Sequence, residues 1–97
     1  MVHINGLIWK IEFTDNEQDL LVDEVVRLGV TDRNEQKIYL YNGLYGKELR
    51  KVLIHELTHA WLFSYGYRLD REIEEMLCSF LDSHAEDILL KADFLME

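Results

Sequence analysis

The stretch VLIHELTHAWLF, residues 52–63, decides how this chain folds. It contains no glycine or proline, and apolar side chains surround the helix that it predicts on nearly every side. Such a pattern is typical of a buried helix, which we expect to span Lys47–Tyr65 and to stop at Gly66. Three ionisable residues interrupt this apolar run: His55, Glu56 and His59.

These three residues form the pattern HExxH, and its spacing is that of a metal site. Histidines four positions apart lie about 40° apart around a helix, so both imidazoles can reach one ion. Imidazole is a good ligand for zinc. Glu56 lies about 100° round the helix from His55, where it can take a proton from a water molecule activated by the metal. We therefore expect His55 and His59 to hold Zn²⁺ and Glu56 to act as the general base.

The alternative interpretation is that two core histidines fall four residues apart by chance. From average amino-acid usage, a bare HExxH arises in roughly a few per thousand chains of this length. This interpretation must also explain why two imidazoles and a carboxylate stand in an otherwise apolar helix, where each needs a polar partner. A metal site accounts for all three residues at once.

The rest of the chain predicts one small α+β domain covering residues 1–97. Alternating apolar residues bounded by turn-like residues predict three strands: residues 2–13, 25–31 and 37–41. Helical spacing of apolar residues predicts a last helix from Asp70, its N-cap, to about Leu90. The expected fold is a small twisted antiparallel sheet of about three strands, packed on two main helices.

Charge, hydropathy and cysteine content indicate which partners and which cellular compartment to expect. The chain has 10 Lys and Arg against 19 Asp and Glu, a net charge of −9, so no nucleic-acid partner is expected. No run of about 18 apolar residues and no secretory signal is present, so we expect no membrane partner. The single Cys78 cannot form an internal disulfide, which predicts a packed thiol in a reducing cytoplasm.

With these residues the chain resembles the HExxH zinc metallopeptidases, the zincins. A strand at 37–41 followed by the HExxH helix is similar to the minimal gluzincin core, and more closely to small phage and prophage proteins related to the ImmA/IrrE metallopeptidases. The resemblance covers roughly residues 28–88, and HExxH is its specific part. It implies a zinc peptidase acting on a cytoplasmic protein or peptide substrate. It also implies that the strand 37–41 lines the cleft and pairs with substrate at its free edge.

A catalytic zinc site needs a third protein ligand, and the resemblance implies a glutamate on the following helix. In ImmA-like sequences, small, apolar or aromatic residues follow the ligand glutamate at +3, +6 and +7. Counting from Glu74 gives the matching residues: Leu77, Phe80 and Leu81. Helix geometry also places Glu74 at the edge of the apolar stripe and Glu75 nearly opposite it. We expect Glu74 as the third ligand, with Glu75 as the alternate, because the polar Ser79 follows Glu75 at +4.

Peptide hydrolysis also needs a donor to steady the oxyanion. Three residues are available for this role: Tyr65, Tyr67 and His84. The competing interpretation is that the tyrosines are half-buried at the helix end and that His84 is a buried histidine with one hydrogen bond.

Two other classes of function remain open. One is a zinc-binding protein with weak or no catalysis, which works through protein–protein contact. The other is a plain interaction module in which HExxH is accidental. The substitution Glu56→Gln distinguishes the first class from an enzyme, because a biological effect that survives it does not depend on the water chemistry. The metal content of the purified protein tests the second class, which predicts no bound zinc.

Overall fold

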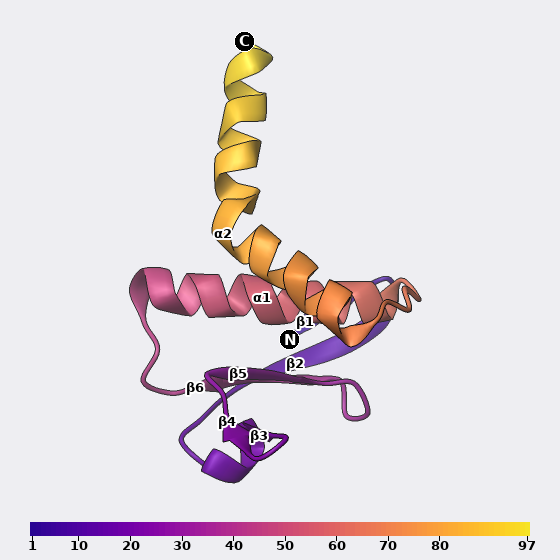
Figure 1. Ribbon diagram of the computed structural model, residues 1–97, viewed down its shortest axis with the longest axis vertical. Coiled ribbons are helices and arrows are strands. Elements are labelled where there is room, and N and C mark those ends of the chain that lie inside the picture. Colours follow the sequence, from indigo (N-terminus) through magenta and orange to yellow (C-terminus); the bar gives the residue numbers. More distant parts are fainter.

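The computed structural model describes residues 1–97 and shows a mixed sheet, with one helix lying on it and a second helix crossing the first (Figure 1). The sheet has the strand order β1-β2-β6-β5: β1 (Val2–Ile4), β2 (Leu7–Thr14), β5 (Gly29–Asp32) and β6 (Lys37–Tyr41). Between β2 and β5 lie a 3-10 helix and a two-stranded sheet: η1 (Glu17–Leu20), β3 (Leu21–Val22) and β4 (Val25–Val26). Two helices complete the chain: α1 (Gly46–Ser64) and α2 (Arg71–Leu95).

The predicted α+β fold with two main helices is confirmed, but the main sheet has four strands and is not wholly antiparallel. A turn at Asn5–Gly6, both with positive φ, divides the predicted amino-terminal strand into β1 and β2. Strands β2 and β6 pair in parallel, with Thr14 opposite Tyr41. This pairing arises because β5 runs back along the sheet from the end where β2 finishes. The predicted hairpin is confirmed as β5–β6, although residues 25 and 26 pair with β3.

The hydrophobic core lies between the sheet and α1. Trp9 of β2, Ile38 and Leu40 of β6 and Ala60 of α1 are completely buried in one cluster with Ile4. Ile38 and Leu40 share a face because alternate residues of a strand point to the same side. Partly buried apolar side chains surround this cluster: Val2, Leu7, Ile11, Leu49, Val52, Leu53, Leu57 and Phe63.

The last turn of α1 is tied to the first hairpin. The Nε1–H of Trp9 donates a buried hydrogen bond to Ser64 Oγ at 2.8 Å, and Asn5 Nδ2 donates to the backbone oxygen of Ser64 at 3.0 Å. The ring of Trp9 also packs edge-on against Phe63, with 6.0 Å between the ring centroids. These contacts hold α1 in one orientation on the sheet, and this orientation decides where its histidines point.

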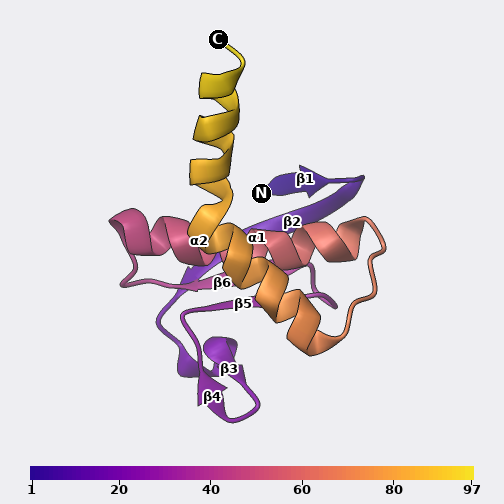
Figure 2. The same cartoon turned by 45° about the horizontal axis from the view of Figure 1, so that its top comes forward.

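The first half of α2 packs across α1, and the second half projects beyond the rest of the molecule (Figures 1 and 2). The helix continues to Leu95, past the predicted end near Leu90. Glu86 still pairs with Arg50 of α1 at 2.5 Å, but the apolar side chains that follow it are exposed: Ile88, Leu89, Leu90, Phe94 and Leu95. Neither helix has the combination of length and apolarity that crossing a lipid bilayer requires.

Replacing Ser64 with alanine should destabilise the fold by about 1–3 kcal/mol, because it leaves the buried Nε1–H of Trp9 without an acceptor. Urea denaturation followed by tryptophan fluorescence measures this loss. The matched control is Ser79→Ala, which alters an exposed serine of α2 and should stay within about 0.5 kcal/mol of the unaltered protein. Equal effects of the two substitutions would contradict the role assigned to Ser64.

Candidate metal centre

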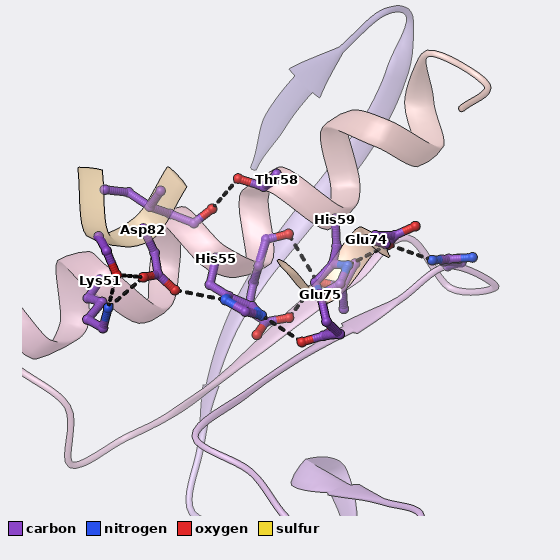
Figure 3. A network of polar contacts seen from close by, with 12 residues as sticks. Lys51, His55, Thr58, His59, Glu74, Glu75 and Asp82 are labelled. Carbon is purple, nitrogen blue, oxygen red and sulfur yellow. Dashed lines mark hydrogen bonds and ion pairs between the residues drawn. The ribbon is translucent and has the colours of Figure 1, made fainter. Parts of the chain in front are cut away.

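The imidazoles of His55 and His59 lie next to each other on the side of α1 that α2 crosses (Figure 3). Their ring centroids are 5.2 Å apart. The side chains are 18% and 13% exposed, so both rings are largely shielded while one side stays open to solvent. The predicted spacing of the two histidines therefore brings their rings to one place.

A carboxylate of α2 faces the Nδ1 atom of each histidine. Asp82 Oδ2 lies 2.8 Å from Nδ1 of His55, and Glu74 Oε2 lies 2.5 Å from Nδ1 of His59. An ionised carboxylate only accepts hydrogen bonds. Opposite such a partner, each Nδ1 therefore carries a hydrogen atom, and its N–H group donates a hydrogen bond to the carboxylate. A neutral ring in this state keeps a lone pair on Nε2, as in histidines that bind metals.

Glu75 lies at the other nitrogen of both rings (Figure 3). Its Oε2 is 3.2 Å from Nε2 of His55, and its Oε1 is 2.7 Å from Nε2 of His59. A lone pair on Nε2 and a carboxylate oxygen repel each other at these distances unless a proton or a metal cation lies between them. Two imidazole nitrogens and a carboxylate are donor types that zinc accepts in proteins.

Both candidate glutamates thus reach the histidines, but at different atoms. Glu74, the expected third ligand, lies at Nδ1 of His59 and also forms an ion pair with Arg33 at 2.8 Å. Glu75, the alternate, lies at both Nε2 atoms. The expectation that Glu75 lies on the side away from the apolar stripe is wrong, because the face of α2 that meets α1 includes Glu74, Glu75 and Asp82 as well as apolar residues such as Cys78. Phe80, which helical spacing placed on the inner side, is 50% exposed.

Asp82 was not among the site residues predicted from the sequence, although it contacts both Lys51 and His55. Its Oδ1 accepts from Lys51 Nζ at 2.5 Å and from Ser83 Oγ at 2.9 Å. Burial alone raises the pKa of the Asp82 carboxyl, but these hydrogen bonds and that of His55 outweigh burial, and its pKa is lowered. The signal was present in the sequence: Asp82 follows Glu75 by seven residues, two helical turns on the same face.

Glu56 is nearly buried, with 7% of the residue exposed, and it faces β5. Thr31 Oγ1 lies 2.8 Å from Glu56 Oε1 and 3.0 Å from the backbone oxygen of Glu56, so its one proton serves either acceptor. Burial raises the pKa of the Glu56 carboxyl. The Thr31 hydrogen bond and the two histidines act in the opposite direction but are weaker, so the pKa is raised overall. A carboxylate with a raised pKa is suited to accept a proton near neutral pH.

Cys78 offers a further donor beside the histidines. One ligand atom from each of His55, His59 and Cys78 lies within 4.8 Å of the others, so this group could hold a metal ion. Burial raises the pKa of the Cys78 thiol to about 12, and the Glu75 and Glu74 carboxylates contribute to this rise. The thiolate is the form that binds metals. A cation bound by Cys78 would have to displace the proton of this fully buried thiol, whereas the Glu75 carboxylate already lies at both Nε2 atoms.

The centre opens into a cavity of about 360 Å³ between α1, α2 and β5. Strand β6, expected to present a free edge to this cleft, is paired on both sides by β2 and β5. The edge strand is β5, and three of its residues line the cavity: Gly29, Val30 and Thr31. The reason for the difference is that β1 and β2 occupy one side of the sheet, which moves β6 into its interior.

The residues considered as oxyanion donors lie elsewhere. Tyr65 and Tyr67 are 52% and 60% exposed, and neither lines the cavity. His84 is exposed rather than buried, and its ring packs against Phe80 with 4.9 Å between centroids.

No protein-family model, curated protein or solved structure gives a significant match to this chain.

Gly29 allows β5 to approach α1 closely. A Cβ atom at this position would lie 2.8 Å from Val52 Cγ1 and 2.9 Å from Glu56 Cγ, closer than van der Waals contact permits. We therefore expect Gly29→Ala to lower the free energy of unfolding by about 1–3 kcal/mol.

Adding Val52→Ala should recover part of the loss, since it removes one of the two clashing groups. Chemical denaturation of the two single variants and the double variant measures this coupling. Strictly additive losses would show that Gly29 is not in tight contact with Val52.

Proposed function

We propose that this chain is a zinc-dependent peptidase in which His55, His59 and Glu75 hold the metal and Glu56 is the general base. The observation that carries the proposal is the Glu75 carboxylate at the Nε2 atoms of both histidines, 3.2 and 2.7 Å away. Two imidazoles and a carboxylate form a common catalytic zinc set, which leaves a fourth position open. Zinc bound there would polarise a scissile carbonyl and lower the pKa of water in the site.

The surrounding residues supply the remaining functions. Asp82 and Glu74 hold the Nδ1–H groups, which leaves the Nε2 atoms to face Glu75. Glu56 accepts the proton of the attacking water and passes it to the leaving amine, a role to which its raised pKa is suited. Thr31 positions the Glu56 carboxylate through its hydroxyl group.

The free edge of β5 provides a place for an extended peptide. Strand β5 pairs only with β6, so the backbone groups on its other edge are available to a substrate strand. Residues of this strand line the cavity beside Glu56. A peptide added to this edge therefore passes the metal centre, which supports a protein or peptide substrate.

A zinc-binding protein that acts through protein–protein contact is the second candidate. The observation that favours it is the projecting half of α2, where Leu90, Phe94 and Leu95 are 63%, 71% and 79% exposed. Exposed apolar patches often mark interaction sites. The two candidates differ in whether Glu56 is needed for the biological effect.

We expect the purified chain to bind one zinc ion. The loss of zinc affinity in single variants shows which residues are its ligands. Glu75→Gln should weaken zinc binding more than Glu74→Gln, for which a loss of about 10–100-fold is expected because Glu74 contacts a histidine rather than the ion. Cys78→Ser should leave the zinc affinity unchanged. Titration against a chromophoric zinc chelator measures all three. Loss of zinc in Cys78→Ser with retention in Glu75→Gln would assign Cys78 as the third ligand instead.

Glu56→Gln should retain zinc but reduce peptide hydrolysis by about 10²–10⁴-fold, since it removes the proton acceptor. Cleavage of fluorescence-quenched peptides, with the metal content of each sample determined in parallel, provides the measurement. Glu72→Gln is the matched control, because Glu72 is an exposed glutamate of α2 with no ion pair. Hydrolysis that survives in Glu56→Gln would contradict the enzyme proposal and favour the contact role.

A further inference from the structure

The cavity beside the metal centre carries more positive charge than the net charge of the protein implies. Three arginines line it: Arg27, Arg33 and Arg71. Three carboxylates balance them: Glu56, Glu74 and Glu75. With a divalent cation bound and the histidines neutral, the lining carries a net charge of +2, although the whole chain carries −9. The cavity therefore favours an anionic group on its ligand.

Two of the three arginines already have a carboxylate partner. Arg33 pairs with Glu74 at 2.8 Å, and Arg71 pairs with Asp23 at 2.6 Å. Arg27 is exposed and has no carboxylate within 4.0 Å. It is the one cation of the cavity whose charge is not matched by the protein, in a chain where acids outnumber bases almost two to one.

The backbone around Arg27 is held in place, although its side chain is free. Its N–H donates to the backbone oxygen of Leu20 at 2.8 Å, and the backbone oxygen of Leu28 accepts from the N–H of Tyr41 at 2.9 Å. Arg27 also lines a second hollow next to the first. The two hollows meet at four residues: Arg27, Gly29, His55 and Glu56. Arg27 thus lines the same two hollows as the predicted proton acceptor and a predicted zinc ligand.

The direction of a bound peptide follows from β5. Antiparallel pairing is the commoner mode of strand addition, and it places the carboxyl side of the peptide next to the start of β5. Strand β5 starts at Gly29, two residues after Arg27. The carboxyl side of such a peptide therefore lies within the region of the cavity that Arg27 lines.

We infer that Arg27 selects substrates by binding a carboxylate on the carboxyl side of the scissile bond. This inference rests on the proposed peptidase function. A guanidinium group matches a carboxylate with two parallel hydrogen bonds. The carboxylate can be the side chain of an aspartate or glutamate or the terminal carboxylate of the peptide, and both present the same chemistry to Arg27.

The test measures binding without cleavage, using the zinc-loaded full chain with Glu56→Gln. Four peptides labelled at the amino end share one sequence and differ at their carboxyl side. One is neutral, with glutamine and a terminal amide. The second has glutamate and an amide, the third has glutamine and a free carboxylate, and the fourth has lysine and an amide. Fluorescence anisotropy gives the dissociation constant of each.

We expect at least one acidic peptide to bind about tenfold more tightly than the neutral peptide, as a charged hydrogen-bonded pair implies. Adding Arg27→Gln should abolish this preference, and Arg27→Glu should transfer it to the lysine peptide. The matched control is Arg50→Gln, which removes an equal charge from α1 at a residue outside both hollows. Which acidic peptide shows the preference identifies the source of the carboxylate.

Equal affinities for the neutral and acidic peptides would overturn the inference, as would a preference that survives Arg27→Gln or the absence of binding to any peptide. Hydrolysis by the unsubstituted chain separates this failure from that of the peptidase proposal. Zinc-dependent cleavage without preference for acidic peptides refutes the role of Arg27 alone. A chain that binds no zinc refutes the proposed function itself.

Discussion

The two imidazoles of α1 need a polar partner at both ring nitrogens, and α2 meets this need with three carboxylates. Asp82 and Glu74 face the Nδ1 atoms, and Glu75 faces the Nε2 atoms. Buried polar groups without partners cost roughly 1–3 kcal/mol each, so this pairing determines where α2 can cross α1. As a result, no buried polar side-chain atom lacks a hydrogen-bond partner.

The same crossing explains why the apolar residues of α2 lie where they do. Because the face of α2 that meets α1 includes these carboxylates, other apolar residues such as Met76 and Phe80 remain 67% and 50% exposed. A helix normally buries its most apolar face. Here the inward face combines apolar residues, such as the fully buried Cys78, with the carboxylates that the histidines of α1 contact. The packing of α2 on α1 and the proposed metal site therefore depend on the same contacts.

Strand β5 has a comparable double role. The absence of a side chain at Gly29 lets β5 lie against Val52 and Glu56, and Thr31 then reaches the Glu56 carboxylate. The other edge of β5 stays free, and Arg27 precedes the strand at the rim of the cavity. The proposed general base, the proposed peptide-binding edge and the unmatched cation thus depend on one short segment. With a divalent cation bound, the charge of the cavity lining differs in sign from the net charge of the chain, which is a sum over all residues.

Sequence alone determined the features that depend on local geometry. The extent of α1, the hairpin β5–β6 and the common side of His55 and His59 all follow from helical and strand periodicity, because these spacings are properties of a few neighbouring residues. Tertiary structure alone decided the parallel pairing of β2 with β6, the position of β5 at the edge, and the different atoms that Glu74 and Glu75 approach. The physical reason is that the inward face of α2 is chosen by what α1 presents to it, and periodicity within α2 carries no information about that partner.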